Sequence, residues 1–184
     1  MKHLPNLLTT LRLVLVVPIC LLIIEKQFAA VLWLSFIAGV SDGLDGWLAR
    51  KLNAHTRYGE VVDPLADKAL LTATFICLAI VSLIPIWLAI IALLRDLIIV
   101  AGAFAYHRLV GRYDMAPSFW GKLNTFIQII FILMIITQQV WAIFPSYLFD
   151  IGIWSIVGLA IISGGHYVFV WGSKAFTEYR KNQK

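Results

Sequence analysis

The residues best suited to do chemistry are four aspartates that fall within 26 residues of one another. Asp42 and Asp45 are three positions apart, and Asp63 and Asp67 are four apart, so each pair shares a face of a helix. Four converging carboxylates repel one another unless protons or cations neutralise them. Mg²⁺ and Mn²⁺ prefer carboxylate and water oxygens, and two such ions can share ligands at roughly 4 Å separation. Because the set contains no His or Cys, zinc is disfavoured, and the pattern predicts a site for hard divalent cations.

The composition indicates where such a site must lie. The chain has 184 residues, of which 61% are apolar and 14% charged, and its mean hydropathy is +0.87. Soluble domains are about 45–50% apolar and about 25% charged, and disordered chains are poorer still in apolar residues. These figures predict an integral membrane protein. The two cysteines lie in apolar runs, so they suggest neither a disulfide framework nor a metal cluster.

Apolar runs in lipid must satisfy their own backbone hydrogen bonds, so they predict helices. Six are expected, at about residues 7–24, 28–51, 60–83, 86–109, 119–140 and 148–170. We therefore expect an all-α, six-transmembrane-helix bundle, formed as one domain over residues 1–184 with a short basic tail at 172–184. Glycines inside the later spans, such as Gly152 and Gly158, are expected at helix-packing contacts.

The basic residues orient these helices. The net charge is +5, which in a membrane protein points to topology and anionic lipid rather than to nucleic acid. Lys26 alone lies on the side away from the termini, while Lys68 and Arg95 fall within spans. Twelve lie on the side of the termini: Lys2, Arg12, Arg50, Lys51, Arg57, Arg108, Arg112, Lys122, Lys174, Arg180, Lys181 and Lys184. The bias predicts cytoplasmic termini in the cell's inner or plasma membrane.

This topology brings the four aspartates together at the cytoplasmic face. Asp42 and Asp45 lie near the end of the second expected helix, and Asp63 and Asp67 near the start of the third. Ordinary surface salt bridges are the alternative, with three basic partners nearby: Arg50, Arg57 and Lys68. Four acids on two adjoining helices, next to glycines that permit close backbone approach, favour a functional site.

Eight residues of this segment fill every fixed position of a known signature. The signature reads D-x-x-D-G-x-x-A-R, eight residues, G, three residues, D, three residues, D. The chain supplies Asp42, Asp45, Gly46, Ala49, Arg50, Gly59, Asp63 and Asp67. It thereby resembles the CDP-alcohol phosphatidyltransferase family, and a Pro-Asn-x-x-Thr-x-x-Arg stretch from Pro5 extends the resemblance to the N-terminus.

The resemblance implies a reaction and a set of roles. Members of this family transfer a phosphatidyl group from CDP-diacylglycerol to an alcohol and release CMP. It implies that Asp42, Asp45 and Asp63 surround one Mg²⁺ or Mn²⁺ ion, and Asp42, Asp63 and Asp67 a second. It also implies that Asp67 is the general base for the acceptor hydroxyl. Five residues are implied to contact the CDP part of the donor: Asn6, Thr9, Gly46, Arg50 and Thr56.

The acceptor must be inferred from other polar residues. Arg95 lies within the fourth span, where a charge is costly and a function is expected, although an internal ion pair with Asp96 or another aspartate is the alternative. Arg108, Arg112 and Lys122 surround the next cytoplasmic loop and either form a basic pocket for phosphate or simply orient the helices. We favour the pocket, and hence glycerol 3-phosphate as acceptor and phosphatidylglycerol phosphate as product.

Two alternatives stay open. The Pro-Ser-x-x-x-Lys-x-Asn-Thr stretch from Pro117 and the basic tail also resemble mitochondrial-type cardiolipin synthases, whose acceptor is phosphatidylglycerol. A cation transporter would use the same aspartates as an ion pathway, but all four gather at one interface and nothing comparable marks the opposite half. Members of this type are commonly homodimers, so the resemblance also implies a homodimer.

Overall fold

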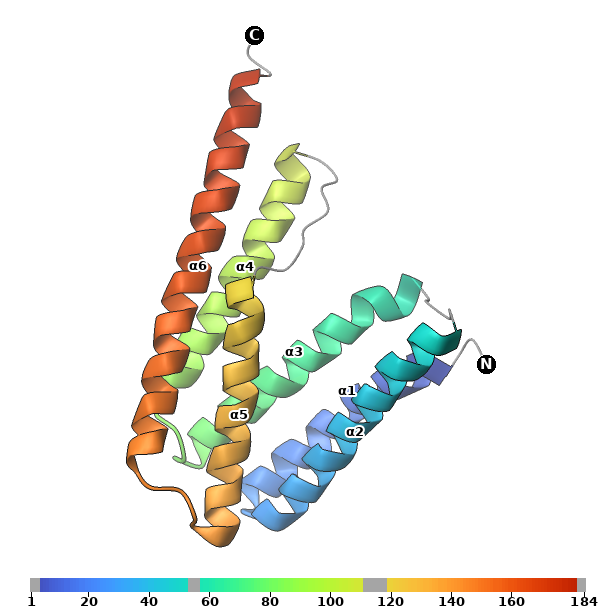
Figure 1. Cartoon of the computed structure of the whole chain (residues 1–184), viewed down its shortest axis with the longest axis vertical. Coiled ribbons are helices and arrows are strands. Elements are labelled where there is room, and N and C mark those ends of the chain that lie inside the picture. Colours follow the sequence, from blue (N-terminus) through green and yellow to red (C-terminus); the bar gives the residue numbers. More distant parts are fainter. Residues whose placement is uncertain (1–3, 53–56, 111–118, 182–184) are drawn as a thin grey trace. The chain divides into compact units, whose positions relative to one another are not determined.

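A computed structural model describes the backbone of residues 4–52, 57–110 and 119–181, and the side chains of residues 13–40, 68–102 and 119–165. Over these ranges the chain is helical and contains no strand. The six helices are α1 (Leu4–Ile24), α2 (Phe28–Leu52), α3 (Arg57–Ile80), α4 (Ile86–Val110), α5 (Phe119–Trp141) and α6 (Tyr147–Lys181) (Figure 1). The expected all-helical class and helix order are confirmed.

The expected boundaries agree with the structure to within three residues, with one exception. The sixth helix continues eleven residues past Val170, to Lys181. Residues 171–181 are more polar, but they include good helix formers such as Lys174, Ala175 and Glu178. The helix therefore continues beyond the end of the apolar run from which it was predicted.

Two helical segments among the described residues are long and apolar enough to cross a membrane, Phe119–Trp141 and Tyr147–Gly165. Large apolar side chains are also exposed on the other helices, for example Val17, Phe36 and Ile80. A soluble monomer rarely exposes so much contiguous apolar surface, so these faces suit a lipid environment.

The chain divides into two compact units. The first comprises residues 1–86 and 132–144, in which α1 packs against both α2 and α3. Its core includes Ile19, Ile23 and Leu78.

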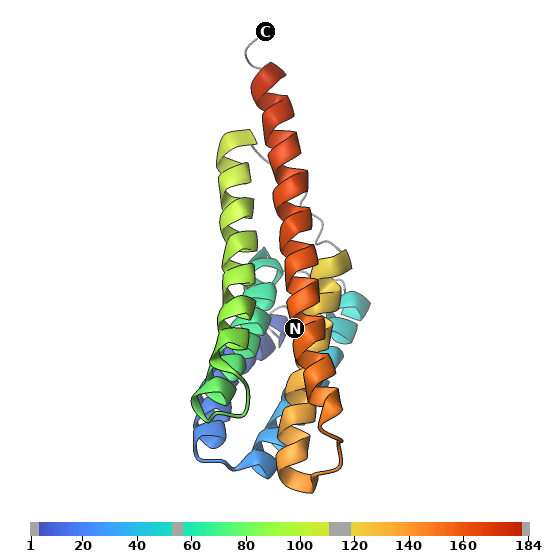
Figure 2. The same cartoon turned by 90° about the vertical axis from the view of Figure 1, so that its left-hand side faces the viewer.

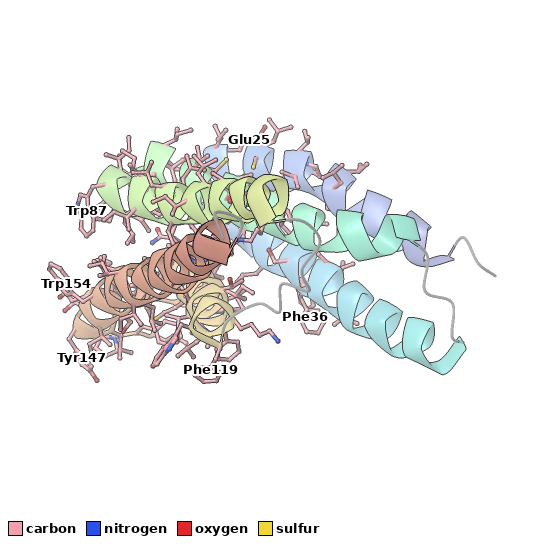
Figure 3. All side chains as sticks on the ribbon, turned by 90° about the horizontal axis from the view of Figure 1, so that it is seen from above. Glu25, Phe36, Trp87, Phe119, Tyr147 and Trp154 are labelled. Atoms are coloured by element: carbon pink, nitrogen blue, oxygen red, sulfur yellow. The ribbon has the colours of Figure 1, made fainter. Side chains whose placement is uncertain are left out.

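The second unit comprises residues 87–131 and 145–184, so it contains α4, the first half of α5 and α6. In this unit α4 and α6 lie side by side in both views (Figure 2). Trp87, in the first turn of α4, and Trp154, two turns into α6, have their ring centroids 6.4 Å apart (Figure 3).

Three helices are followed by a residue in the left-handed backbone conformation that is not glycine: Lys26 (φ 60°), Ser82 (φ 60°) and Ala142 (φ 50°). After α3 the Leu83 N–H donates to the Leu78 carbonyl oxygen at 2.9 Å, and the Ser82 N–H to the Ala79 carbonyl oxygen at 3.0 Å. This pair of bonds is a Schellman motif. It ends α3 at Ile80, three residues before the expected Leu83.

Ser82 has a positive φ, at which a Cβ atom strains the backbone. Because the Ser82 side chain is exposed, no packing contact offsets this strain. We expect Ser82→Gly to stabilise the protein by about 0.5–1 kcal/mol. The thermal unfolding midpoint Tm in detergent micelles measures the change. Ser82→Ala is the matched control, since alanine keeps the steric cost. A Tm for Ser82→Gly no higher than that of Ser82→Ala would contradict the explanation.

Gly152 is the contact point between α6 and α5 in the second unit. A Cβ added at Gly152 would clash with the ring of buried Phe131, touching Cδ2 and lying 2.7 Å from Cε2. A Cβ at Gly158 meets nothing within 4 Å. The expected packing role is therefore confirmed for Gly152, whereas Gly158 has open space.

This contrast within one helix makes a direct test. We expect Gly152→Ala to destabilise the second unit by about 1–3 kcal/mol, because the methyl group forces the Phe131 ring out of its position. Gly158→Ala adds the same methyl group to open space. A fall in Tm for Gly152→Ala alone is expected, and equal Tm values for the two variants would refute the assigned contact.

Candidate functional site

The helix bounds give the depth of each aspartate, measured along its own helix from the end of α2 or from the start of α3. Asp45 lies seven residues before the end of α2, and Asp63 six residues after the start of α3, which corresponds to about 10 Å along each helix. Asp42 and Asp67 each lie ten residues from the same ends, or about 15 Å. Within each pair the two residues share a helix face. Asp45 therefore matches Asp63 in depth, and Asp42 matches Asp67.

The first unit brings these helix ends to one end of α1. α1 packs against both α2 and α3, and its start lies at the same end as the end of α2 and the start of α3 (Figure 1). Asn6 and Thr9, three positions apart, lie in the first two turns of α1. The helix order therefore supports the expected approach of these two residues to the aspartate segment.

Several predicted site residues are placed by their backbone only. The helices carry Gly46 and Arg50 in α2 and Arg108 in α4, together with the aspartates and the two α1 residues, but their side chains lie outside the described set. Thr56 and Arg112 lie outside the described residues altogether.

The donor chemistry of the aspartate segment suits hard cations. All four candidate ligands offer carboxylate oxygen, which Mg²⁺ and Mn²⁺ prefer, and none offers the sulfur or imidazole nitrogen typical of zinc sites. Among the residues whose side chains are described, no group of three or more His, Cys, Asp or Glu residues gathers elsewhere. The α2–α3 segment thus offers a set of donors that fits a hard divalent cation.

Arg95 joins the three helices of the second unit. Its side chain is buried, with 5% of its surface exposed. Its Nη1 donates to Asp96 Oδ1 at 2.5 Å, its Nε donates to Ser163 Oγ on α6 at 3.0 Å, and its Nη2 lies 3.4 Å from the Gly121 carbonyl oxygen on α5. The internal Arg95–Asp96 ion pair, held open as an alternative above, is therefore present.

This network leaves room for a second role of Arg95. A guanidinium has five N–H groups, and three of those of Arg95 have partners among the described residues. Lys122, in the first turn of α5, is exposed and one residue after Gly121. The structure thus places Arg95 and Lys122 close to the same helix start.

Of three further buried polar residues in this region, Gln128 and Ser163 were missed in the sequence, whereas Asn124 was noted only within the stretch from Pro117. Asn124 and Gln128 on α5 and Ser163 on α6 have between 0% and 2% of their surface exposed. The Ser163 hydroxyl accepts the hydrogen bond from Arg95 Nε–H. A single serine in an apolar helix gives no sign in the sequence of such a partner. Gln128 could have been noticed, because it lies four residues after Asn124 and therefore on the same face of an otherwise apolar span.

The chain is similar in sequence to several known proteins. The pattern of the family described as CDP-alcohol phosphatidyltransferase matches residues 2–163. A CDP-diacylglycerol–glycerol-3-phosphate 3-phosphatidyltransferase of Bacillus subtilis is 30% identical over 187 residues, covering 91% of this chain and 94% of that protein. A CMP-forming cardiolipin synthase of Homo sapiens is 28% identical over 186 residues, covering 92% of this chain and 62% of that protein.

A probable phosphatidylglycerophosphate synthase of Mycobacterium tuberculosis is 37% identical over 134 residues, or 68% of this chain and 62% of that protein. The chain therefore spans about six-tenths of the length of the last two relatives and nearly all of the first. Because the family pattern covers most of its length, the chain belongs to the CDP-alcohol phosphatidyltransferase family.

Proposed function

We propose that the protein transfers a phosphatidyl group from CDP-diacylglycerol to glycerol 3-phosphate, which gives phosphatidylglycerol phosphate and CMP. The observation that carries the proposal is the depth match of the two aspartate pairs on α2 and α3, within a complete family signature. The name of the Bacillus subtilis relative, which matches along nearly its whole length, supports the same reaction and acceptor.

The proposed chemistry follows from the residues. The acceptor hydroxyl oxygen attacks the phosphorus of the phosphatidyl group, and a new P–O bond forms as the P–O bond to CMP breaks. The hydroxyl proton passes to a carboxylate oxygen of Asp67, and the electron pair of the broken bond leaves with CMP. Asp42, Asp45, Asp63 and Asp67 would hold two Mg²⁺ or Mn²⁺ ions. Bound there, these ions neutralise the charge that the displacement spreads over the phosphate oxygens.

Other residues position the two substrates. Gly46 lets the nucleotide lie against the α2 backbone, Arg50 pairs with a phosphate oxygen, and Thr56 contacts the same CDP group. Asn6 and Thr9 approach it from α1. For the acceptor, a basic pocket binds the phosphate of glycerol 3-phosphate. Four residues form it in this proposal: Arg95, Arg108, Arg112 and Lys122.

The proposal includes a topology. Six helices cross the inner or plasma membrane, both termini are cytoplasmic, and the site opens at the cytoplasmic face. The twelve-to-one distribution of basic residues supports this orientation. A lipid-soluble donor stays among the helices while CMP leaves into water, which suits a site at the interface. By resemblance the active form is a homodimer.

A cardiolipin synthase activity, with phosphatidylglycerol as acceptor, is the second candidate. The stretch from Pro117 to Thr125 and the human relative favour it. Both candidates share the donor, the metal site and the release of CMP. They differ in whether the acceptor is a water-soluble phosphate or an anionic lipid.

One assay separates these candidates. Purified protein is supplied with CDP-diacylglycerol and either glycerol 3-phosphate or phosphatidylglycerol, and CMP release is measured with Mg²⁺, with Mn²⁺ and with a chelator. We expect metal-dependent CMP release with glycerol 3-phosphate, lost on chelation and restored by either ion. Release with phosphatidylglycerol instead would establish the second candidate. No release with any alcohol, despite bound donor, would overturn the transferase proposal and favour the transporter.

A further inference from the structure

Buried polar side chains concentrate in one place within the described chain. Five are buried, and Thr74 satisfies its hydroxyl on the carbonyl oxygen of its own helix, at Leu70. The other four all belong to the second unit, on α4, α5 and α6: Arg95, Asn124, Gln128 and Ser163. Polar groups inside a membrane-type bundle are costly and usually functional, so this cluster calls for a physical reason.

Half of the cluster is satisfied. Arg95 donates to Ser163 Oγ, and the Ser163 hydroxyl lies 3.4 Å from the Ala160 carbonyl oxygen. The other half is open. Asn124 Nδ2, Asn124 Oδ1 and Gln128 Nε2 are buried and have no hydrogen-bond partner among the described residues. Buried amide atoms without a partner are rare in folded proteins, because each has lost its water and gained nothing in return.

The open amides lie on a defined face of α5. Gly121, Asn124 and Gln128 follow one another at spacings of three and four residues, so they share a face. Arg95 reaches the start of this face through its contact with the Gly121 carbonyl oxygen. Asn124 lies about 8 Å and Gln128 about 14 Å from the start of α5 at Phe119. Both amides therefore lie within the first three turns of α5.

The atoms themselves define what they bind. The open set comprises two NH₂ groups, which donate, and one carbonyl oxygen, which accepts. An ionised phosphate oxygen only accepts, so it would leave Asn124 Oδ1 facing negative charge. A hydroxyl group both donates and accepts, and it satisfies the amide set from either side.

We propose that Asn124 and Gln128 determine acceptor specificity by hydrogen bonding to the hydroxyl of the acceptor that does not react. This inference rests on the proposed phosphatidyl transfer. Glycerol 3-phosphate and phosphatidylglycerol both carry a secondary hydroxyl beside the reacting one, so the same pair of amides reads either acceptor. Arg95, at the start of the face, lies where the charged part of the acceptor is held. A buried site of this kind rejects an analogue that lacks the hydroxyl, because its amides then stay unpaired.

The test uses the full-length protein with CDP-diacylglycerol and measures CMP release. Each acceptor is paired with an analogue that lacks the secondary hydroxyl: glycerol 3-phosphate with 3-hydroxypropyl phosphate, and phosphatidylglycerol with its propane-1,3-diol counterpart. We expect the wild-type protein to prefer the natural acceptor at least tenfold in kcat/KM, mainly through KM. Asn124→Leu removes the amide at nearly constant volume and should reduce the preference to below threefold.

A second variant and a control guard against a purely structural effect. Gln128→Leu is expected to reduce the preference in the same direction. Thr125→Val lies between these residues, and its hydroxyl bonds within α5 to the Gly121 carbonyl oxygen at 3.2 Å, so it should keep the wild-type preference. A fall in preference with wild-type activity on the analogue is specific to lost recognition, whereas misfolding lowers activity on both acceptors.

Two results would overturn the inference while the transferase proposal stands. One is a wild-type protein that uses both members of each pair equally well. The other is retention of the full preference in both leucine variants. Absence of CMP release from the wild-type protein with every acceptor is a different outcome, because it removes the proposed function and this inference with it.

Discussion

An Asp67→Asn variant is expected to lose more than nine-tenths of its phosphatidyl transfer while it keeps its fold. The amide has nearly the shape of the carboxylate, so the α3 backbone has no reason to change. It cannot take up the proton of the acceptor hydroxyl, and it removes one negative charge from the proposed metal ligands. CMP release at saturating donor and acceptor measures the loss, and Tm together with binding of CDP-diacylglycerol measures what is kept.

The matched control is Asp150→Asn, the same change at an exposed aspartate in the first turn of α6. It should transfer at close to the wild-type rate. Retention of more than a tenth of the wild-type turnover by Asp67→Asn would rule out Asp67 as the general base. Loss of donor binding together with turnover would assign Asp67 to donor binding instead.

The second large effect is expected at Arg95, and it concerns stability. Arg95→Met keeps the length of the side chain but removes the bonds to Asp96, Ser163 and Gly121, which join three helices. Removing one partner of a buried ion pair commonly costs about 3–5 kcal/mol, because the other charge stays behind in an apolar setting. A fall of that size in the free energy of unfolding is expected, seen as a marked drop in Tm.

Ser163→Ala calibrates this result. It removes one hydrogen bond to the same guanidinium and should cost about 1 kcal/mol. Arg95→Lys keeps the charge but not the planar fork, so it should lie between the two. If Arg95→Met is no less stable than Ser163→Ala, the Arg95 network does not hold the second unit together.

Much of the helix pattern was predictable from apolar runs and the polar residues that interrupt them. The end of α3 was not, because the Schellman motif there places Ser82 at positive φ, where glycine would have signalled the turn. The end of α6 was not either, because hydropathy marks where lipid contact stops, and a helix can continue in water on propensity alone.

The predictable part of the site is the part whose residues are close together in the sequence. The aspartates are close in sequence, and helix geometry turns their spacing into matched depths on α2 and α3. The polar cluster of the second unit joins residues 68 positions apart, Arg95 and Ser163. Single polar residues in apolar helices give no sign of which partner they face, so only the folded arrangement reveals that Ser163 serves Arg95 while Asn124 has no partner among the described residues.

The length of α6 has a mechanical consequence. Its apolar run ends near Val170, and the helix then continues for the eleven residues to Lys181, or about 17 Å. The whole helix is about 52 Å long, so a tilt of about 10° around its first turn would sweep the far end through about 9 Å. A spectroscopic label on the last turns of α6 would therefore move far enough to report small tilts of the helix.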